Sequence, residues 1–146
     1  MPHPSIAVLD REMDQLHAQF PTAQLPPNCV TMMQAEFVEY ESRVMLKVSA
    51  LVLEDFLNPM KTMQGGLIAA AFDNTFGPLS YVAARHPCIT LDIHTNFIRP
   101  IMMGDALTVT ARVVSRSGST MHLSAEAHNS KGKLIATATS HMTMVK

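Results

Sequence analysis

The sequence predicts an α+β fold in which one curved antiparallel sheet wraps around a single buried helix. Apolar residues recur every three or four positions in two segments, as in helices, and every second position in most of the others, as in strands. Three consecutive strand segments near the end of the chain are joined by tight turns, so they form an antiparallel meander. One helix is apolar on nearly all sides and therefore needs a sheet to cover it.

An amphipathic helix is expected first, over residues 6–20, because its apolar positions are spaced by three and four. Prolines end this helix and begin a loop. Two strands are expected next, over residues 30–39 and 42–53, with a hairpin turn at Glu41-Ser42. In the second strand, alternate apolar positions are expected to share one face: Val44, Leu46 and Val48.

A second helix is expected from Leu67 through an alanine-rich stretch that favours helix formation. One of its faces carries Ile68, Phe72, Phe76 and Leu79. Pro78 is expected to kink or restart this helix, because proline has no backbone N–H to donate. Four strands with period-two alternation follow, over residues 88–98, 106–115, 119–128 and 133–145. The chain thus divides into an N-terminal helix and loop, residues 1–27, and a single domain, residues 28–146.

The composition excludes several classes of function. The 146 residues are 47% apolar and 16% charged, with a formal net charge of −1, so the chain lacks the basic surface that nucleic-acid binding requires. Its longest mainly apolar stretch, residues 67–72, is far shorter than the roughly 20 residues that span a membrane, and residues 1–5 begin no signal peptide. Cys29 and Cys88 form neither a CxxC motif nor a disulfide framework, so a reduced cytoplasmic protein is expected. The surplus of apolar residues predicts a large core or a surface that faces another chain.

The common motifs for nucleophilic catalysis, phosphate binding and zinc binding are missing, and the seven histidines predict no metal site. His122 and His128 share a strand face but lie six residues apart, about 20 Å, so they are too distant to bind one ion. Asp92 and His94 lie two residues apart on one strand face and could pair. Cys88 is expected to be a small core residue.

The candidate catalytic residues lie at the start of the central helix and within it. Gly65 and Gly66 allow another group to approach the backbone closely. The first amides of a helix have no internal partner and lie at the positive end of its dipole, so they are suited to hold a developing oxyanion. Asp73 is a carboxylate in an otherwise apolar helix, where it is costly unless it is paired or useful. Because Gly65 and Asp73 are eight residues apart, about 12 Å along a helix, they can meet at one carbonyl only if a second copy of the helix runs antiparallel alongside.

Three motifs give the chain a resemblance to the hotdog-fold thioesterases, in particular the branch that includes the phenylacetic-acid-pathway thioesterase. They are Asn58-x5-Gln64-Gly65-Gly66-x6-Asp73, Thr90-Leu-Asp-Ile-His-Thr-Asn-Phe-Ile-Arg99-Pro100, and Gly104-Asp105 before a strand. The resemblance covers about residues 58–145. It implies a hotdog fold with a long central helix, a homodimer whose sheets join edge to edge, and further pairing into a dimer of dimers. The implied reaction is hydrolysis of an acyl-CoA thioester without a cofactor.

By this resemblance, Asp73 is the catalytic carboxylate, acting as nucleophile or as general base for water. The Gly65 N–H polarises the thioester carbonyl, and Asn58 orients the carbonyl or the water. Thr90 presents a hydroxyl to the carboxylate across the dimer. Gln64 stands where many members have histidine, so it can hydrogen-bond to the substrate or the loop but cannot titrate near neutral pH. The candidate substrate-binding residues, including those for the CoA phosphates, are Gly66, Arg99, Arg116 and Gly118.

Two other functions are also compatible with these residues. A non-catalytic dimeric hotdog module could bind acyl-CoA or another apolar ligand, since Gln64 replaces histidine. A hydratase or dehydratase would pair a histidine with a carboxylate, and His94 is the only candidate near the site. The length of the acyl chain is not encoded in any motif, although Met-rich walls would suit a broad apolar pocket.

Overall fold

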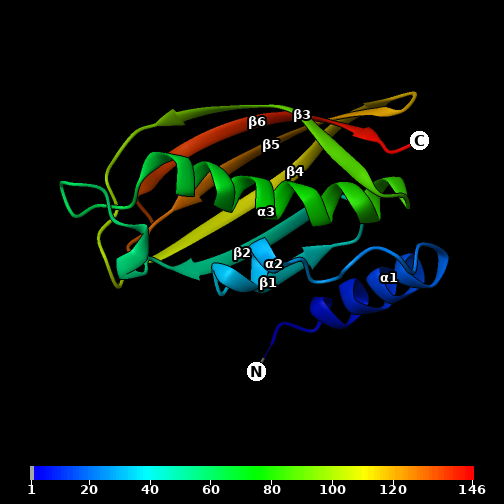
Figure 1. The fold of residues 1–146 in the computed structure, drawn as a ribbon, viewed down its shortest axis with the longest axis horizontal. Helices are drawn as coiled ribbons and strands as arrows, with labels where there is room; N and C mark the ends of the chain where they lie inside the picture. The colour runs from blue at the N-terminus through cyan, green and yellow to red at the C-terminus, as the bar shows by residue number, and fades with distance from the viewer. Residues whose placement is uncertain (1) are drawn as a thin grey trace.

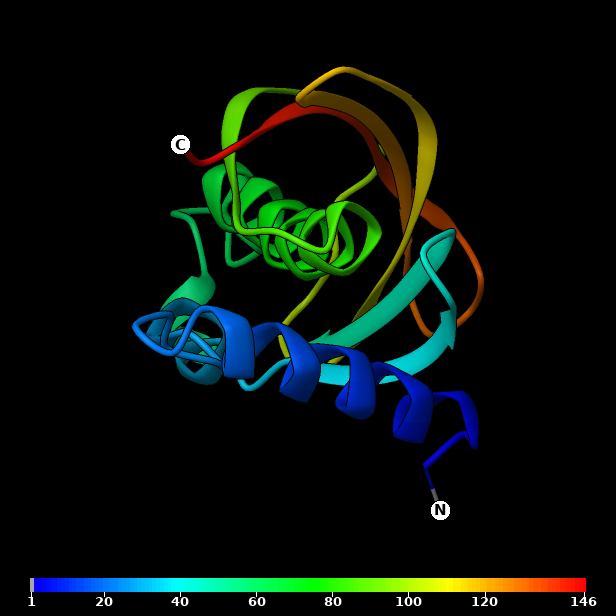
Figure 2. The same cartoon turned by 90° about the vertical axis from the view of Figure 1, so that its right-hand side faces the viewer.

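The computed structural model describes residues 2–146 and contains a six-stranded antiparallel sheet with the strand order β1-β2-β4-β5-β6-β3. The strands are β1 (Glu36–Glu41), β2 (Met45–Leu51), β3 (Cys88–Phe97), β4 (Ala106–Ser117), β5 (Thr120–His128) and β6 (Leu134–Met144). The helices are α1 (Ser5–Gln19), α2 (Asn28–Met32), the short 3-10 helix η1 (Glu54–Phe56) and α3 (Gly65–Ala84). Figure 1 shows α3 lying across the sheet, and the end-on view in Figure 2 shows the sheet curving around it. The predicted hotdog fold is confirmed.

The core lies between α3 and the concave face of the sheet. The predicted helix face, formed by Ile68, Phe72, Phe76 and Leu79, is buried, with at most 4% of any of these side chains exposed. The sheet meets it with alternate residues of its central strands, which include Leu107, Val109, Ala111, Met121, Leu123, Ala125 and Ala127. Each large side chain buried in this way contributes about 1.5–3 kcal/mol. The alternation seen in the sequence therefore identifies the core face of these strands.

The central helix is longer than predicted and passes through Pro78 without a second start. It runs from Gly65 to Ala84 as one element, with Pro78 inside it. A proline inside a helix removes a backbone hydrogen bond and costs about 3 kcal/mol. Packing on nearly all sides of α3 outweighs that cost, because most helical stability in proteins comes from tertiary contacts.

Two predicted boundaries before α3 are wrong. The strand expected over residues 30–39 begins only at Glu36, because residues 28–32 form α2. Val30 and Met33 are both buried and lie three residues apart, which is the spacing of a helix. The sequence around them shows no alternation of apolar and polar residues that would support a strand there. The strand expected over residues 42–53 spans Met45–Leu51. The turn before it occupies three residues and includes Arg43 at φ 63°, so Val44 falls in the turn and is exposed.

The N-terminal helix α1 is attached to β1, at the edge of the sheet opposite β3 (Figure 2). The Tyr40 N–H donates a hydrogen bond to Ser5 Oγ over 2.9 Å. The Tyr40 hydroxyl donates to Glu12 and accepts from the Arg43 N–H, also over 2.9 Å. Burial, together with the hydrogen bond to Glu12, raises the pKa of Tyr40 to about 12. A single tyrosine thus joins α1, β1 and the turn that follows β1.

The edge strand β3 changes faces at a bulge. Thr90 pairs with Met142 and Asp92 pairs with His141, which leaves Leu91 as an extra residue between them. One extra residue reverses which side chains face the helix. Thr90 therefore points to α3, whereas Asp92 and His94 point to the outer face of the sheet.

Cys88 is buried, as predicted, and burial raises the pKa of its thiol. No helix within residues 2–146 is long and apolar enough to cross a membrane. In the same part of the chain, no three or more His, Cys, Asp or Glu side chains are grouped so that they could hold a metal ion.

Candidate active site

The start of α3 presents two free backbone donors. Gln64 is the N-cap residue, and its side-chain oxygen accepts a hydrogen bond from the Leu67 N–H over 3.0 Å. Its carbonyl accepts from the Leu67 and Ile68 N–H groups. Within residues 2–146, the N–H groups of Gly65 and Gly66 have no acceptor. They lie at the positive end of the helix dipole, which is the arrangement that binds an anion or a developing oxyanion.

The Gln64 side chain is used to cap the helix, so it does not extend toward a substrate. Its backbone is held as well, because the Gln64 N–H donates to the Phe56 carbonyl over 2.8 Å and the adjacent Met63 N–H donates to Ile101 over 3.0 Å. A Cβ added to Gly66 would lie 2.8 Å from the Gln64 amide oxygen. The second glycine therefore leaves room for the Gln64 cap, because a side chain at position 66 would displace the Gln64 amide.

Asp73 lies in the middle of α3 and is half-buried. Its Oδ1 accepts a hydrogen bond of 2.8 Å from the Thr90 hydroxyl of the same chain. The expectation that Thr90 faces the carboxylate across a dimer is wrong in this respect, because β3 follows α3 directly and runs back beside it. This bond leaves the second carboxylate oxygen, Oδ2, without a side-chain donor among residues 2–146.

The two halves of the predicted site are separated within one chain. Gly65 and Asp73 lie on the same helix, eight residues or about 12 Å apart. Strand β3 lies beside the helix and shows the same separation. Thr90, near one end of the strand, is hydrogen-bonded to Asp73, and Phe97, at the other end, lies beside Gly65. One chain alone cannot place Asp73 and the Gly65 N–H at a single carbonyl group.

Asn58 stabilises its own loop. Its side-chain oxygen accepts from the Met60 and Thr62 N–H groups, over 3.0 and 3.1 Å, and its amide donates to the Thr62 hydroxyl over 2.8 Å. One amide hydrogen is left for a substrate or a water molecule. The loop shaped by these bonds leads into the start of α3.

Arg99 and Arg116 lie far apart in one chain. Arg99 donates to the Leu134 carbonyl over 2.7 Å, close to the start of α3. Arg116 donates to the Ala83 carbonyl over 2.8 Å, where it neutralises the negative end of the α3 dipole. The two ends of α3 are roughly 28 Å apart, so these cations do not converge on one phosphate group. Gly118 forms the exposed turn between β4 and β5 at φ 59°.

The outer face of the sheet carries a separate polar region. His94 lines an open hollow of about 450 Å³ together with Arg112, Glu126 and His128. Asp92 pairs with the His141 ring at 3.1 Å rather than with His94, and the hydrogen bond from His141 lowers the pKa of Asp92. His94 and Asp73 lie on opposite faces of the sheet, so the placement of His94 near the site is wrong, and these two residues do not form a histidine–carboxylate pair within one chain.

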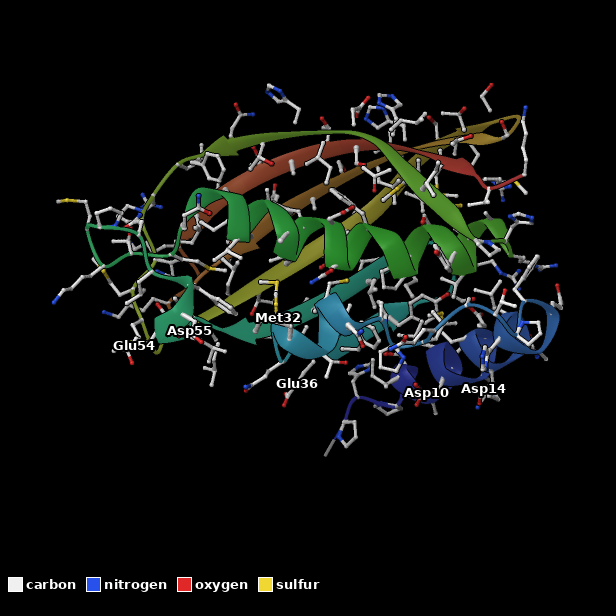
Figure 3. All side chains as sticks on the ribbon, viewed as in Figure 1. Asp10, Asp14, Met32, Glu36, Glu54 and Asp55 are labelled. Atoms are coloured by element: carbon white, nitrogen blue, oxygen red, sulfur yellow. The ribbon has the colours of Figure 1, made fainter. Side chains whose placement is uncertain are left out.

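A group of exposed carboxylates lies on the side of the molecule away from β3. Figure 3 labels five of them along α1, the start of β1 and η1: Asp10, Asp14, Glu36, Glu54 and Asp55. In that view they occupy the lower side, whereas β3 crosses the upper side. An anionic ligand is repelled by this face and is favoured near Lys61, four residues before α3, and Arg99, two residues after Phe97.

Comparisons with known proteins agree with the observed fold. A family model described as the thioesterase superfamily matches residues 60–136. The E. coli PaaI protein from the phenylacetic acid degradation operon superposes with a TM-score of 0.80 at 19% identity, covering 94% of this chain and 95% of that one. A hypothetical thioesterase from Streptococcus pneumoniae with coenzyme A gives 0.71 at 20% identity, covering 76% and 85%. The smu.793 protein from Streptococcus mutans, bound to acetyl CoA, gives 0.73 at 22% identity, covering 85% and 94%. No curated protein matches the chain significantly in sequence.

Proposed function

The chain belongs to the thioesterase superfamily, and on that premise we propose that it hydrolyses an acyl-CoA thioester to a free acid and CoA. The observation that carries the proposal is that one helix presents both groups: a free Gly65 N–H at its start and, farther along, an Asp73 carboxylate that is held by a hydrogen bond. The CoA and acetyl CoA found with two structures of the same fold support a CoA thioester as the substrate.

We propose that the site is shared between two subunits that pair through β3. This strand is an edge of the sheet, and it exposes Ile89 and Leu91, each more than half accessible. An open edge with apolar side chains favours pairing with another strand. In an antiparallel pairing about a two-fold axis, the Thr90 end of one strand lies beside the Phe97 end of the other. That arrangement brings the partner's Asp73 toward the Gly65 N–H.

In the proposed reaction, the Gly65 N–H binds the carbonyl oxygen of the thioester and stabilises the negative charge that develops on it. The partner subunit's Asp73 either takes a proton from the attacking water or attacks the carbonyl carbon itself. When Asp73 acts as base, the C–S bond breaks to give the free acid, and the proton held by Asp73 passes to the leaving CoA sulfur. When Asp73 attacks directly, breaking the C–S bond leaves a mixed anhydride on Asp73, the CoA thiolate takes a proton from water, and a second water hydrolyses the anhydride to the free acid and restores the carboxylate. The hydrogen bond from Thr90 fixes one carboxylate oxygen and leaves the other for either route. Trapping a mixed anhydride with hydroxylamine distinguishes attack by the carboxylate from attack by water.

A thiol-release assay over short, medium, long and aromatic acyl-CoAs tests the proposal. We expect turnover by the parent protein and a loss of about 10²–10⁴-fold in kcat for Asp73→Asn, since positioned acid–base groups contribute on that scale. Asp10→Asn is the matched control, because it removes an exposed carboxylate of α1, which lies at the edge of the sheet opposite β3. Equal turnover in Asp73→Asn and the parent contradicts the role of Asp73. Tight calorimetric binding of acyl-CoA without hydrolysis identifies a binding module instead.

The dimer of dimers, the cytoplasmic location and the roles of Gly66, Arg99, Arg116 and Gly118 in binding CoA stay predictions. Arg99 is the stronger of the two arginine candidates, because it lies two residues after Phe97 and close to the free donors. Arg116 has a sufficient role within its own chain at the end of α3.

A further inference from the structure

The Phe97 ring occupies the space beside Gly65 where a side chain would otherwise be. A Cβ built on Gly65 would lie 3.2 Å from the tip of this ring, with two further ring atoms at 3.4 and 3.5 Å. Those distances leave no room for a side chain between the ring and the Gly65 backbone. Phe97 is nevertheless 55% exposed in the single chain, so its ring covers the helix start on one side and leaves the other side to solvent or, in the proposed dimer, to the partner's strand.

The backbone around Phe97 holds the ring in this position. After the bulge at Leu91, alternate residues of β3 face α3, and Phe97 is the last of them. The strand ends there, and the next two N–H groups, of Ile98 and Arg99, both donate to the Ile135 carbonyl, over 2.8 and 3.1 Å. Phe97 is therefore fixed by its strand rather than by burial of its own side chain. A large exposed apolar group adds little to the stability of one chain, which leaves its contact with Gly65 to be explained.

We propose that Phe97 is a positioning residue for the oxyanion donor: its ring fixes the first turn of α3 and shields one side of the Gly65 N–H from water. The inference rests on the proposed function, in which that N–H binds the thioester oxygen. A hydrogen bond is electrostatically stronger where water is excluded, and a fixed donor needs no rearrangement as charge develops. Removing the ring weakens the donor without removing it.

The first test measures kinetics and stability together. Phe97→Ala is expected to lower kcat about tenfold with KM changed less than about twofold, since the interaction lost belongs to the transition state. Phe97→Tyr, which keeps the ring, restores the parent rate. Ile98→Ala is the matched control, because Ile98 is 54% exposed and adjacent in sequence. A rise in KM at unchanged kcat, or an equal loss of kcat in Ile98→Ala, overturns the inference.

The second test is independent of activity. The solvent-exchange rate of the Gly65 amide, measured by NMR, is expected to rise severalfold in Phe97→Ala and to stay at the parent value in Ile98→Ala. An unchanged rate in Phe97→Ala shows that the ring does not shield the donor and contradicts the inference. If the parent hydrolyses no acyl-CoA, the proposed function fails by itself, while the exchange rates still decide whether Phe97 shields Gly65.

Discussion

Replacing Gly65 by proline removes the proposed oxyanion donor with little change elsewhere. Gly65 is the first residue of α3, where proline is favoured because its fixed φ suits the helix and its missing N–H has no helical partner. The residue before a proline must be extended, and Gln64 already has φ −65° and ψ 136°. Within the described residues 2–146 the Gly65 N–H has no acceptor, so no internal hydrogen bond is lost.

Gly65→Ala is the control that isolates the N–H group. Alanine and proline both place a Cβ near the Phe97 ring, at 3.2 Å in the present geometry, so both require the ring to move by a few tenths of an ångström. Only proline removes the donor. Deleting one oxyanion donor costs about 10²–10³ in kcat, or about 2.7–4 kcal/mol. We expect the ratio of kcat between Gly65→Ala and Gly65→Pro to fall in that range.

The assay is thiol release at saturating acyl-CoA, with thermal unfolding of each variant followed by circular dichroism. The two variants are expected to unfold within a few degrees of each other, because neither loses an internal bond at this position. If Gly65→Pro retains the rate of Gly65→Ala, the Gly65 amide does not hold the oxyanion. The chemical role assigned to the start of α3 is then refuted.

Three further predictions follow from particular contacts. Thr90→Val is expected to lower kcat/KM about 10-fold or more, since a hydrogen bond to a charged group contributes about 1.5–3 kcal/mol, and Thr90→Ser is expected to keep most of the parent value because it retains the hydroxyl. Leu91→Lys is expected to shift the sedimentation of the protein from dimer to monomer and to abolish turnover together with it, because the charge lies on the open edge of β3. Tyr40→Phe is expected to lower the unfolding temperature at pH 7 by several degrees at unchanged kcat. The raised pKa of Tyr40 means that its extra stability is complete below pH 10.0 and is lost as pH rises to about 12, so the difference between Tyr40→Phe and the parent narrows over that interval in thermal unfolding.

The sequence was sufficient to predict most of the fold, because its long elements carry strong periodicity. The four strands after α3 and the apolar face of that helix were identified from alternation and spacing alone. The five-residue helix α2 was missed, since one turn and a half is too short to show a period. The turn before β2 was misplaced because a three-residue turn with Arg43 at positive φ has no glycine to mark it.

The candidate site was predicted where it depends on one helix and missed where it depends on contacts between elements. The distance between Gly65 and Asp73 follows from helix geometry. The faces of β3 depend on the bulge at Leu91, which no residue type signals, so alternation alone put Asp92 and His94 on one face but could not show that this face points away from Asp73. Phe97 was not singled out, because its contact with Gly65 joins residues that are far apart in the sequence.

The central claim is that Asp73 of one subunit acts with the Gly65 N–H of the other, and subunit mixing tests it most directly. Asp73→Asn and Gly65→Pro proteins each lose about 10²-fold or more in kcat in this account. Co-expression with two different affinity tags yields heterodimers that can be isolated. Half of the sites in such a heterodimer combine an intact Asp73 with an intact Gly65 N–H, so we predict about half of the parent activity per dimer. A heterodimer with activity no higher than that of the two single-variant homodimers would show that both groups must come from one chain, which contradicts the shared site.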